Sequence, residues 1–134
     1  MSIRIVRLGS PRRPGEGLRI GTVRRPPRGV PKEQIAARDI YDVWFPNLAP
    51  SEALLKERPN PDDPVAWRAF ERRFLAEMKL APARRDLDLL AALSHHAELS
   101  VGCYCEHEAR CHRSLLRRLL SERGARIADD EPAR

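Results

Sequence analysis

Most of the side chains that can do chemistry lie in one short segment, which runs from Cys103 to Ser114. This segment holds all three cysteines of the chain, together with two histidines, two glutamates and two arginines. Thiols, imidazoles and guanidiniums in close sequence suit nucleophilic catalysis, the binding of an anion, or the coordination of a soft metal ion. The segment is therefore the candidate functional site.

The elements expected on either side of this segment predict an anion pocket. Residues 99–105 are apolar enough for a buried strand, and the leucine spacing in residues 112–123 predicts a helix. A helix that begins beyond the carboxyl end of such a strand offers free N–H groups and a positive dipole to an anion. We expect Arg113 and Ser114 to add to this pocket, and the pKa of Cys111 to be lowered at the helix start. The candidate catalytic residues are Cys111, Cys103 and His112.

Two other interpretations of the segment stay open. The residue types also suit zinc, and the candidate ligands are Cys103, Cys105, Cys111 and either His107 or His112. The Cys-x-Cys pair and the five-residue gap before the next Cys-His pair depart from the usual zinc spacing, so no metal is favoured. In the third interpretation the thiols are small buried side chains and a histidine caps the helix. Counted from Cys105, the Cys-x5-Arg signature of cysteine phosphatases is absent.

Hydrophobic periodicity predicts strands that alternate with helices. Strands are expected at residues 3–8, 18–23, 41–45 and 99–105, with a last edge strand at 125–128. Helices are expected at 32–38, 51–56, 65–80, from 82 to about 96, and 112–123. This order implies a three-layer α/β fold with a largely parallel sheet flanked by helices, in a single domain over residues 1–134. We expect residues 9–17 to form a mobile loop and residues 129–134 a frayed tail.

Composition limits the partners and the compartment. The chain of 134 residues has a formal net charge of +6 and a pI of about 9.9, which favours anionic partners such as a small anionic ligand. Tight binding to generic duplex DNA is not favoured, because arginines are mixed with acidic residues along the expected helices. The first residues lack a signal peptide, and no apolar run could span a membrane, so we expect a cytoplasmic protein without a membrane partner. An odd number of cysteines in one segment predicts free thiols.

Two motifs resemble those of a bacterial family, domain of unknown function 488. The first is the run Cys111–Leu116, which follows a strand, a cysteine and an acidic loop. The second is Arg24 with Pro27–Val30, which fits the frame of the family's Asp-Arg-Leu-Trp-Pro-Arg-Gly-type motif, although Val23 and Pro26 replace its acidic and aromatic residues. Further residues sit where the family's middle motifs would fall: Trp44, Ala49, Pro50, Ser51, Trp67, Phe70 and Glu77.

The resemblance covers most of the chain and implies an α/β fold, but it implies no particular reaction or cofactor. It suggests that Arg24 and Arg28 converge with Arg113 on one pocket. We therefore expect a Cys/His/Arg-lined anion pocket that binds or acts on a nucleotide-like or nucleic-acid phosphate. The alternative is a noncatalytic module that binds a metal or nucleic acid. Neither the patterning nor the resemblance predicts the oligomeric state.

Overall fold

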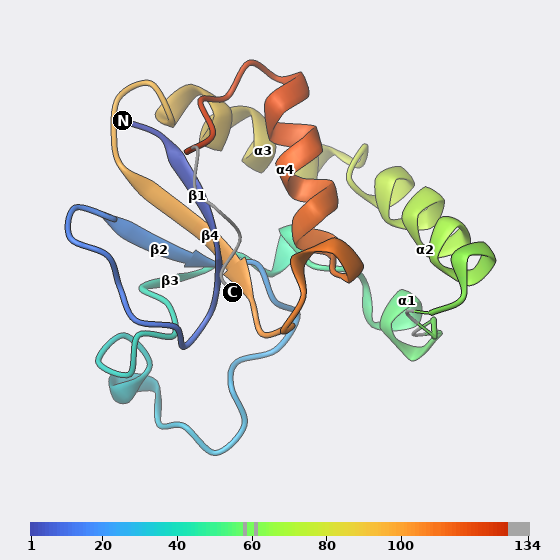
Figure 1. Ribbon diagram of the computed structural model, residues 1–134, viewed down its shortest axis with the longest axis horizontal. Helices are drawn as coiled ribbons and strands as arrows, with labels where there is room; N and C mark the ends of the chain where they lie inside the picture. The colour runs from blue at the N-terminus through green and yellow to red at the C-terminus, as the bar shows by residue number, and fades with distance from the viewer. Residues whose placement is uncertain (58, 61, 129–134) are drawn as a thin grey trace.

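Four parallel strands form a single sheet in the computed structural model, which describes residues 1–57, 59–60 and 62–128. The strands lie in the order β1 (Ile3–Arg7), β4 (Leu99–Cys103), β2 (Leu18–Gly21) and β3 (Val43–Trp44) (Figure 1). The strand latest in sequence, β4, therefore lies at the centre and is buried along its whole length. The tail expected to fray, residues 129–134, lies outside the described residues.

The described residues form four α-helices. In chain order, α1 (Glu52–Lys56), α2 (Pro64–Glu77) and α3 (Ala81–Leu93) lie between β3 and β4, and α4 (His112–Glu122) follows β4. Helices α3 and α4 cover one face of the sheet, while α1 and α2 lie to its side (Figure 1). The predicted α/β fold with a parallel sheet is confirmed. None of the described helices is long and apolar enough to cross a membrane.

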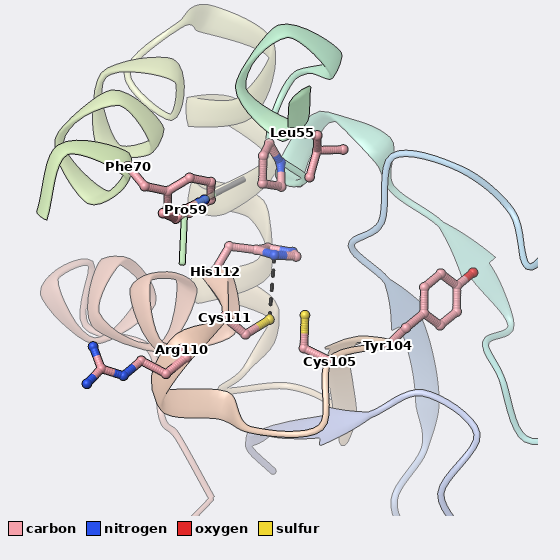
Figure 2. Close-up of a pocket in the computed structure, with 9 residues that line it drawn as sticks. Leu55, Pro59, Phe70, Tyr104, Cys105, Arg110, Cys111 and His112 are labelled. Atoms are coloured by element: carbon pink, nitrogen blue, oxygen red, sulfur yellow. Dashed lines mark hydrogen bonds between the residues drawn. The ribbon is translucent and has the colours of Figure 1, made fainter. Parts of the chain in front are cut away.

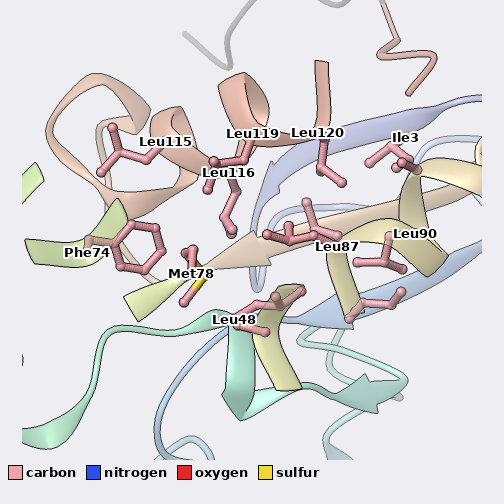
Figure 3. Close-up of a cluster of buried hydrophobic side chains, with 14 of the residues drawn as sticks. Ile3, Leu48, Phe74, Met78, Leu87, Leu90, Leu115, Leu116, Leu119 and Leu120 are labelled. Carbon is pink, nitrogen blue, oxygen red and sulfur yellow. The ribbon is translucent and has the colours of Figure 1, made fainter. Parts of the chain in front are cut away.

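The main hydrophobic core lies between the sheet and its helical layer. One face of the central strand contributes Leu99 and Val101, and α3 contributes Leu87 and Leu90. Leucines of α4 close the core from above, and Phe74 closes it from α2 (Figure 3). Burial of these apolar side chains holds the first turn of α4 against the end of β4.

Three expected elements are reduced to a single turn, two residues or one bridge in the structure. The helix expected at 32–38 is a 3₁₀ turn at Lys32–Gln34, and the strand at 41–45 is reduced to β3. Pro46 ends β3 because proline cannot donate a ladder hydrogen bond, and it opens a 3₁₀ helix instead. The strand expected at 125–128 consists of one parallel bridge, between Ile127 and Ile3.

The opposite face of the sheet is covered by irregular segments that a buried ion pair holds in place. Arg19, which is fully buried, binds Glu16 through two hydrogen bonds of 2.9 Å. The same guanidinium donates to the carbonyl oxygens of Ser10 at 2.8 Å and Asp39 at 2.6 Å. Ser100 of β4 donates to Glu16 at 3.2 Å. The third layer is therefore fastened to the sheet by one carboxylate and one guanidinium, rather than by apolar packing alone.

This ion pair predicts a specific loss of stability at acid pH. Burial alone would raise the pKa of Glu16, but the hydrogen bonds and the charge of Arg19 outweigh it, so the pKa is lowered. The stabilisation is therefore complete above about pH 4.3 and is lost as the pH falls through the folded-state pKa. At pH 7 we expect Glu16→Gln to lower the free energy of unfolding by about 3 kcal/mol, measured by urea denaturation, because it leaves Arg19 buried without its carboxylate.

The difference between wild type and Glu16→Gln should shrink as the pH falls through the folded-state pKa of Glu16, since the wild-type carboxyl then becomes neutral too. Glu33→Gln is the matched control, because Glu33 is exposed and makes no ion pair with a described residue. A difference between wild type and Glu16→Gln that does not change with pH would contradict the assignment.

Candidate functional site

The expected chemical segment forms the crossover between the central strand and α4. Cys103 is the last residue of β4, and Cys111 precedes the first turn of α4. Both side chains are buried, at 1% and 3% exposure, whereas Cys105 between them is exposed. The fold thus returns the chain so that two cysteines eight positions apart meet at the carboxyl end of the sheet.

The orientation of the His112 ring is fixed by Thr22, the residue that follows β2. The carbonyl oxygen of Gly102 accepts hydrogen bonds from the backbone N–H and the hydroxyl of Thr22, both at 2.9 Å. The carbonyl oxygen of Thr22 in turn lies 2.7 Å from Nε2 of His112. A carbonyl only accepts, so Nε2 carries the proton and Nδ1 is left as an acceptor. Gly102 is required here, because a Cβ would lie 2.5 Å from the Val6 carbonyl oxygen.

The unprotonated ring nitrogen of His112, Nδ1, faces a pair of sulfur atoms. Nδ1 lies 3.7 Å from Sγ of Cys111, and that sulfur lies 2.6 Å from Sγ of Cys103. The three donor atoms lie within 4.8 Å of one another. Cys105 also turns its sulfur toward Cys111 and His112 (Figure 2). This arrangement combines a nucleophile, an acceptor nitrogen and a carbonyl that orients the imidazole.

The two buried thiols differ in how readily they lose a proton. Hydrogen bonds from the thiols of Cys103 and Cys105 lower the pKa of Cys111, and the backbone N–H and charge of Arg113 lower it further against the effect of burial. Hydrogen bonding to Cys105 and Cys111, together with burial, raises the pKa of Cys103. Cys111 is therefore the thiolate of the pair, and Cys103 is the thiol that donates to it.

Burial favours a neutral imidazole beside this thiolate. It lowers the pKa of His112 by more than the hydrogen bond to Thr22 and the charge of Cys105 raise it, and the charge of Arg113 lowers the pKa further. Arg113 is 4% exposed and donates to the carbonyl oxygen of Cys105 at 2.6 Å. It is therefore the fixed positive charge beside the Cys111 thiolate, and it also holds the crossover in shape.

The cluster opens onto two adjoining cavities of about 390 and 550 Å³, which we call the thiol groove. Both cavities share five lining residues: Pro50, Leu55, Tyr104, Cys105 and His112. Cys111 lines the first cavity, with Phe70 and Arg110, and Cys103 lines the second, with Arg28. The groove is thus apolar in its middle and carries arginines at both ends.

A family model for the active DUF488-N3 subclade matches residues 3–124. The chain belongs to the DUF488 family. The predicted resemblance is confirmed over nearly the whole chain. No curated protein and no solved structure is significantly similar to it.

In this DUF488 protein the residues expected to bind an anion do not share one pocket. Arg28 is exposed on the thiol groove, and its side chain has no hydrogen bond or ion pair with any described residue. Arg24 also lines the groove but donates to the carbonyl oxygens of Pro50 and Ala49, both at 3.0 Å. Arg113 lines a separate cleft, so the structure does not bring it together with Arg28.

The remaining expected residues have local roles or lie apart from the cluster. The hydroxyl of Ser114 donates to the carbonyl oxygen of Cys111 at 2.9 Å, inside the first turn of α4. His107, a candidate metal ligand, lines the separate cleft with Arg113. Of the two candidate imidazoles, the structure therefore places only His112 beside the three cysteines.

Three site residues of the DUF488 protein were not singled out from the pattern, although Tyr104 and Arg110 lie in the candidate segment. Thr22 orients His112 through its backbone carbonyl, for which a side-chain pattern carries no signal. Arg110 is exposed on the groove and has no side-chain partner among the described residues. Tyr104 lies on the wall shared by both cavities, and only its position next to Cys103 could have drawn attention to it.

A Cys-x5-Arg spacing does occur in the chain, counted from Cys111 to Arg117. Arg117 lies within α4, and its guanidinium binds Glu108 through hydrogen bonds of 2.7 and 2.8 Å. The guanidinium is therefore held on Glu108 outside the thiol groove. The phosphatase loop, in which this arginine cradles the substrate, is not formed among the described residues.

Selective alkylation tests the assignment of the thiolate. With limiting iodoacetamide at neutral pH we expect Cys111 to be labelled before Cys103, because both are buried but only Cys111 has a lowered pKa. Peptide mapping by mass spectrometry identifies the labelled residue. Cys105→Ser removes the exposed thiol and should leave this order unchanged. Labelling of Cys103 ahead of Cys111 would contradict the assignment.

Proposed function

We propose that the protein is a cysteine-dependent enzyme that binds a nucleotide-like phosphate in the thiol groove and attacks it with Cys111. The observation that carries the proposal is the alignment of Cys111 Sγ, His112 Nδ1 and the Thr22 carbonyl at the floor of that groove. Nucleophile, base and orienting group in this order are the arrangement of covalent catalysis.

The first step uses the thiolate. Sγ of Cys111 forms a bond to the electrophilic phosphorus while the bond to the leaving oxygen breaks, and that oxygen keeps the electron pair and takes a proton from solvent. Cys103 stabilises the attacking sulfur by donating its S–H, and Arg113 balances its negative charge from behind. Neither residue has to reach the substrate for this role.

The second step uses the imidazole. A water molecule attacks the phosphorus, Nδ1 of His112 takes the proton from that water, and the S–P bond breaks to regenerate the thiolate. The hydrogen bond to Thr22 holds Nδ1 on the side of the sulfur, and Phe74 packs on the ring at 5.6 Å between centroids. A neutral imidazole is the form that this step needs, which agrees with the lowered pKa of His112.

The lining of the groove supports a ligand with a planar body and an anionic group. Tyr104, Pro50 and Leu55 offer an apolar surface in the middle of the groove. Arg28 at one end and Arg110 at the other are exposed guanidiniums without partners among the described residues. Such guanidiniums suit a phosphate, and an aromatic face suits a base.

Binding of a nucleoside monophosphate tests the ligand class. We expect Arg28→Ala to weaken the binding of adenosine monophosphate roughly 10-fold or more, because a charge-assisted hydrogen bond contributes about 1.5–3 kcal/mol. Arg7→Ala is the matched control, because Arg7 is exposed and lines the separate cleft. Calorimetry measures both. Equal losses in the two variants would show that only the overall charge matters.

Turnover tests the chemistry. Wild-type protein is incubated with nucleoside mono-, di- and triphosphates, and products are separated by chromatography. We expect Cys111→Ala to lose about 1,000-fold or more of any turnover, while His107→Ala, in the same loop but outside the groove, retains it. Undiminished turnover in Cys111→Ala, or neither binding nor turnover in the wild type, would overturn the proposal.

Duplex DNA is a poor alternative ligand because several arginines in and beside the helices are paired with acidic residues. Arg118 of α4 binds Glu71 at 2.9 Å, and Arg123, which follows α4, binds Asp88 at 3.0 Å. We therefore expect weak binding of labelled duplex at physiological salt, falling steeply as salt rises. Fluorescence anisotropy at low and physiological salt measures this. Tight binding that survives the higher salt, and that Arg24→Ala with Arg25→Ala abolishes, would favour the nucleic-acid-binding module instead.

A further inference from the structure

We propose that Cys103, Cys111 and His112 also form a binding site for a soft divalent metal ion of the Zn²⁺ class, with Cys105 as the fourth ligand. Three sulfurs and one imidazole nitrogen are a common ligand set for tetrahedral zinc. Binding would regulate the enzyme, since the metal takes the sulfur of Cys111; that consequence rests on the proposed function. The metal site itself rests on the geometry alone.

The donor atoms already converge on one point. Sγ of Cys103, Sγ of Cys111 and a ring nitrogen of His112 lie within 4.8 Å of one another, and all three residues are buried. Ligands at about 2.3 Å from zinc place two sulfurs roughly 3.8 Å apart. The two sulfurs, now 2.6 Å apart, therefore have to separate by roughly 1 Å. Small rotations about the Cα–Cβ bonds achieve this without moving the strand or the helix.

The support around His112 is that of a metal ligand. Ligating histidines usually donate their second ring N–H to a carbonyl or carboxylate, which fixes the orientation of the ring. Here Nε2 donates to the Thr22 carbonyl oxygen at 2.7 Å, and Nδ1 faces the sulfurs. The nitrogen that would bind the ion is thus the one that the hydrogen bond to the Thr22 carbonyl leaves without a proton.

Cys105 supplies a ligand on the open side. Its sulfur points toward Cys111 and His112 from the wall of the thiol groove, while its residue is exposed (Figure 2). An ion arriving through the groove meets Cys105 first and the buried pair behind it. Three thiolates around one divalent ion leave a single net negative charge, and the buried guanidinium of Arg113 lies close enough to balance it.

The irregular spacing of the cysteines does not exclude this site once the fold is known. The usual short spacing belongs to sites in which one loop supplies neighbouring ligands. Here β4 supplies Cys103 and the start of α4 supplies Cys111, so the sheet and not the loop sets their separation. The spacing argument also cannot separate His107 from His112, whereas the structure places His107 in the other cleft.

The experiment titrates reduced protein with Co²⁺ and then displaces it with Zn²⁺. We expect thiolate-to-cobalt charge-transfer absorption, the visible bands of tetrahedral cobalt, and release of protons on binding. Competition with a chromophoric chelator gives the zinc affinity. We expect Cys103→Ser and His112→Gln each to weaken it roughly 100-fold or more. His107→Gln, an exposed histidine of the same loop, is the matched control and should change nothing.

Circular dichroism and alkylation of the remaining thiols confirm that each variant is folded. No charge-transfer band in the wild type, undiminished affinity in folded Cys103→Ser, or a loss confined to His107→Gln would overturn the site.

The metal-site proposal and the enzyme proposal can fail separately, because metal binding is measured without substrate. If the wild type binds zinc as expected but Cys111→Ala keeps its turnover, the proposed enzymatic function is wrong and the metal site stands. If turnover depends on Cys111 but the protein shows no cobalt bands, the metal site is wrong and the enzymatic function stands.

Discussion

The hydrogen bond from His112 Nε2 to the Thr22 carbonyl is the constraint on which the site depends, because it decides where the other ring nitrogen points. It joins two elements that are remote in sequence, the exit of β2 and the first residue of α4. Its acceptor is in turn fixed by Gly102, whose carbonyl holds both the N–H and the hydroxyl of Thr22. Loss of this bond would leave a buried imidazole donor unsatisfied, at a cost of about 1–3 kcal/mol, and would free the ring to turn. The central strand therefore shapes the site in two ways: its backbone at Gly102 fixes Thr22, and Cys103 supplies a thiol.

Charge is buried at the junction between β4 and α4. A thiolate in an apolar setting needs compensation, which comes from the S–H of Cys103, the start of α4 and the guanidinium of Arg113. Arg113 is itself buried, so thiolate and guanidinium each remove part of the cost of burying the other. This explains why the arginine of the Cys-His-Arg run does not lie on the thiol groove beside Arg28. It acts on the sulfur from within the protein, whereas Arg28 and Arg110 line the thiol groove and have no side-chain partner among the described residues.

How far the site could be predicted depends on whether a feature is local. The strand before Cys103 and the helix after Cys111 follow from hydrophobic periodicity, and both occur close to their expected bounds. The junction between them was therefore predictable, as was the gathering of thiols there. Which arginines line the groove could not be predicted. Whether a guanidinium faces a groove or a backbone carbonyl depends on tertiary contacts such as that of Arg24 with Pro50. The carbonyl of Thr22 has no side-chain signature at all. The short 3₁₀ turn at Lys32–Gln34 and the two-residue β3 show the same limit, since local breakers there outweigh periodicity.

The same donor set supports a nucleophile and a metal site because both need a sulfur that loses its proton easily. What separates the two proposed outcomes is whether the sulfur of Cys111 bonds to a substrate atom or to a metal ion. A sulfur bound to the metal is not available to attack phosphorus, so under the two proposals a metal ion and a substrate compete for Cys111. Cys105 stands at the mouth of the cluster and is the only one of the three cysteines that is exposed. Its thiol lowers the pKa of Cys111, which favours the nucleophile, and under the proposed metal site it is also the ligand that an arriving ion can reach before the buried pair.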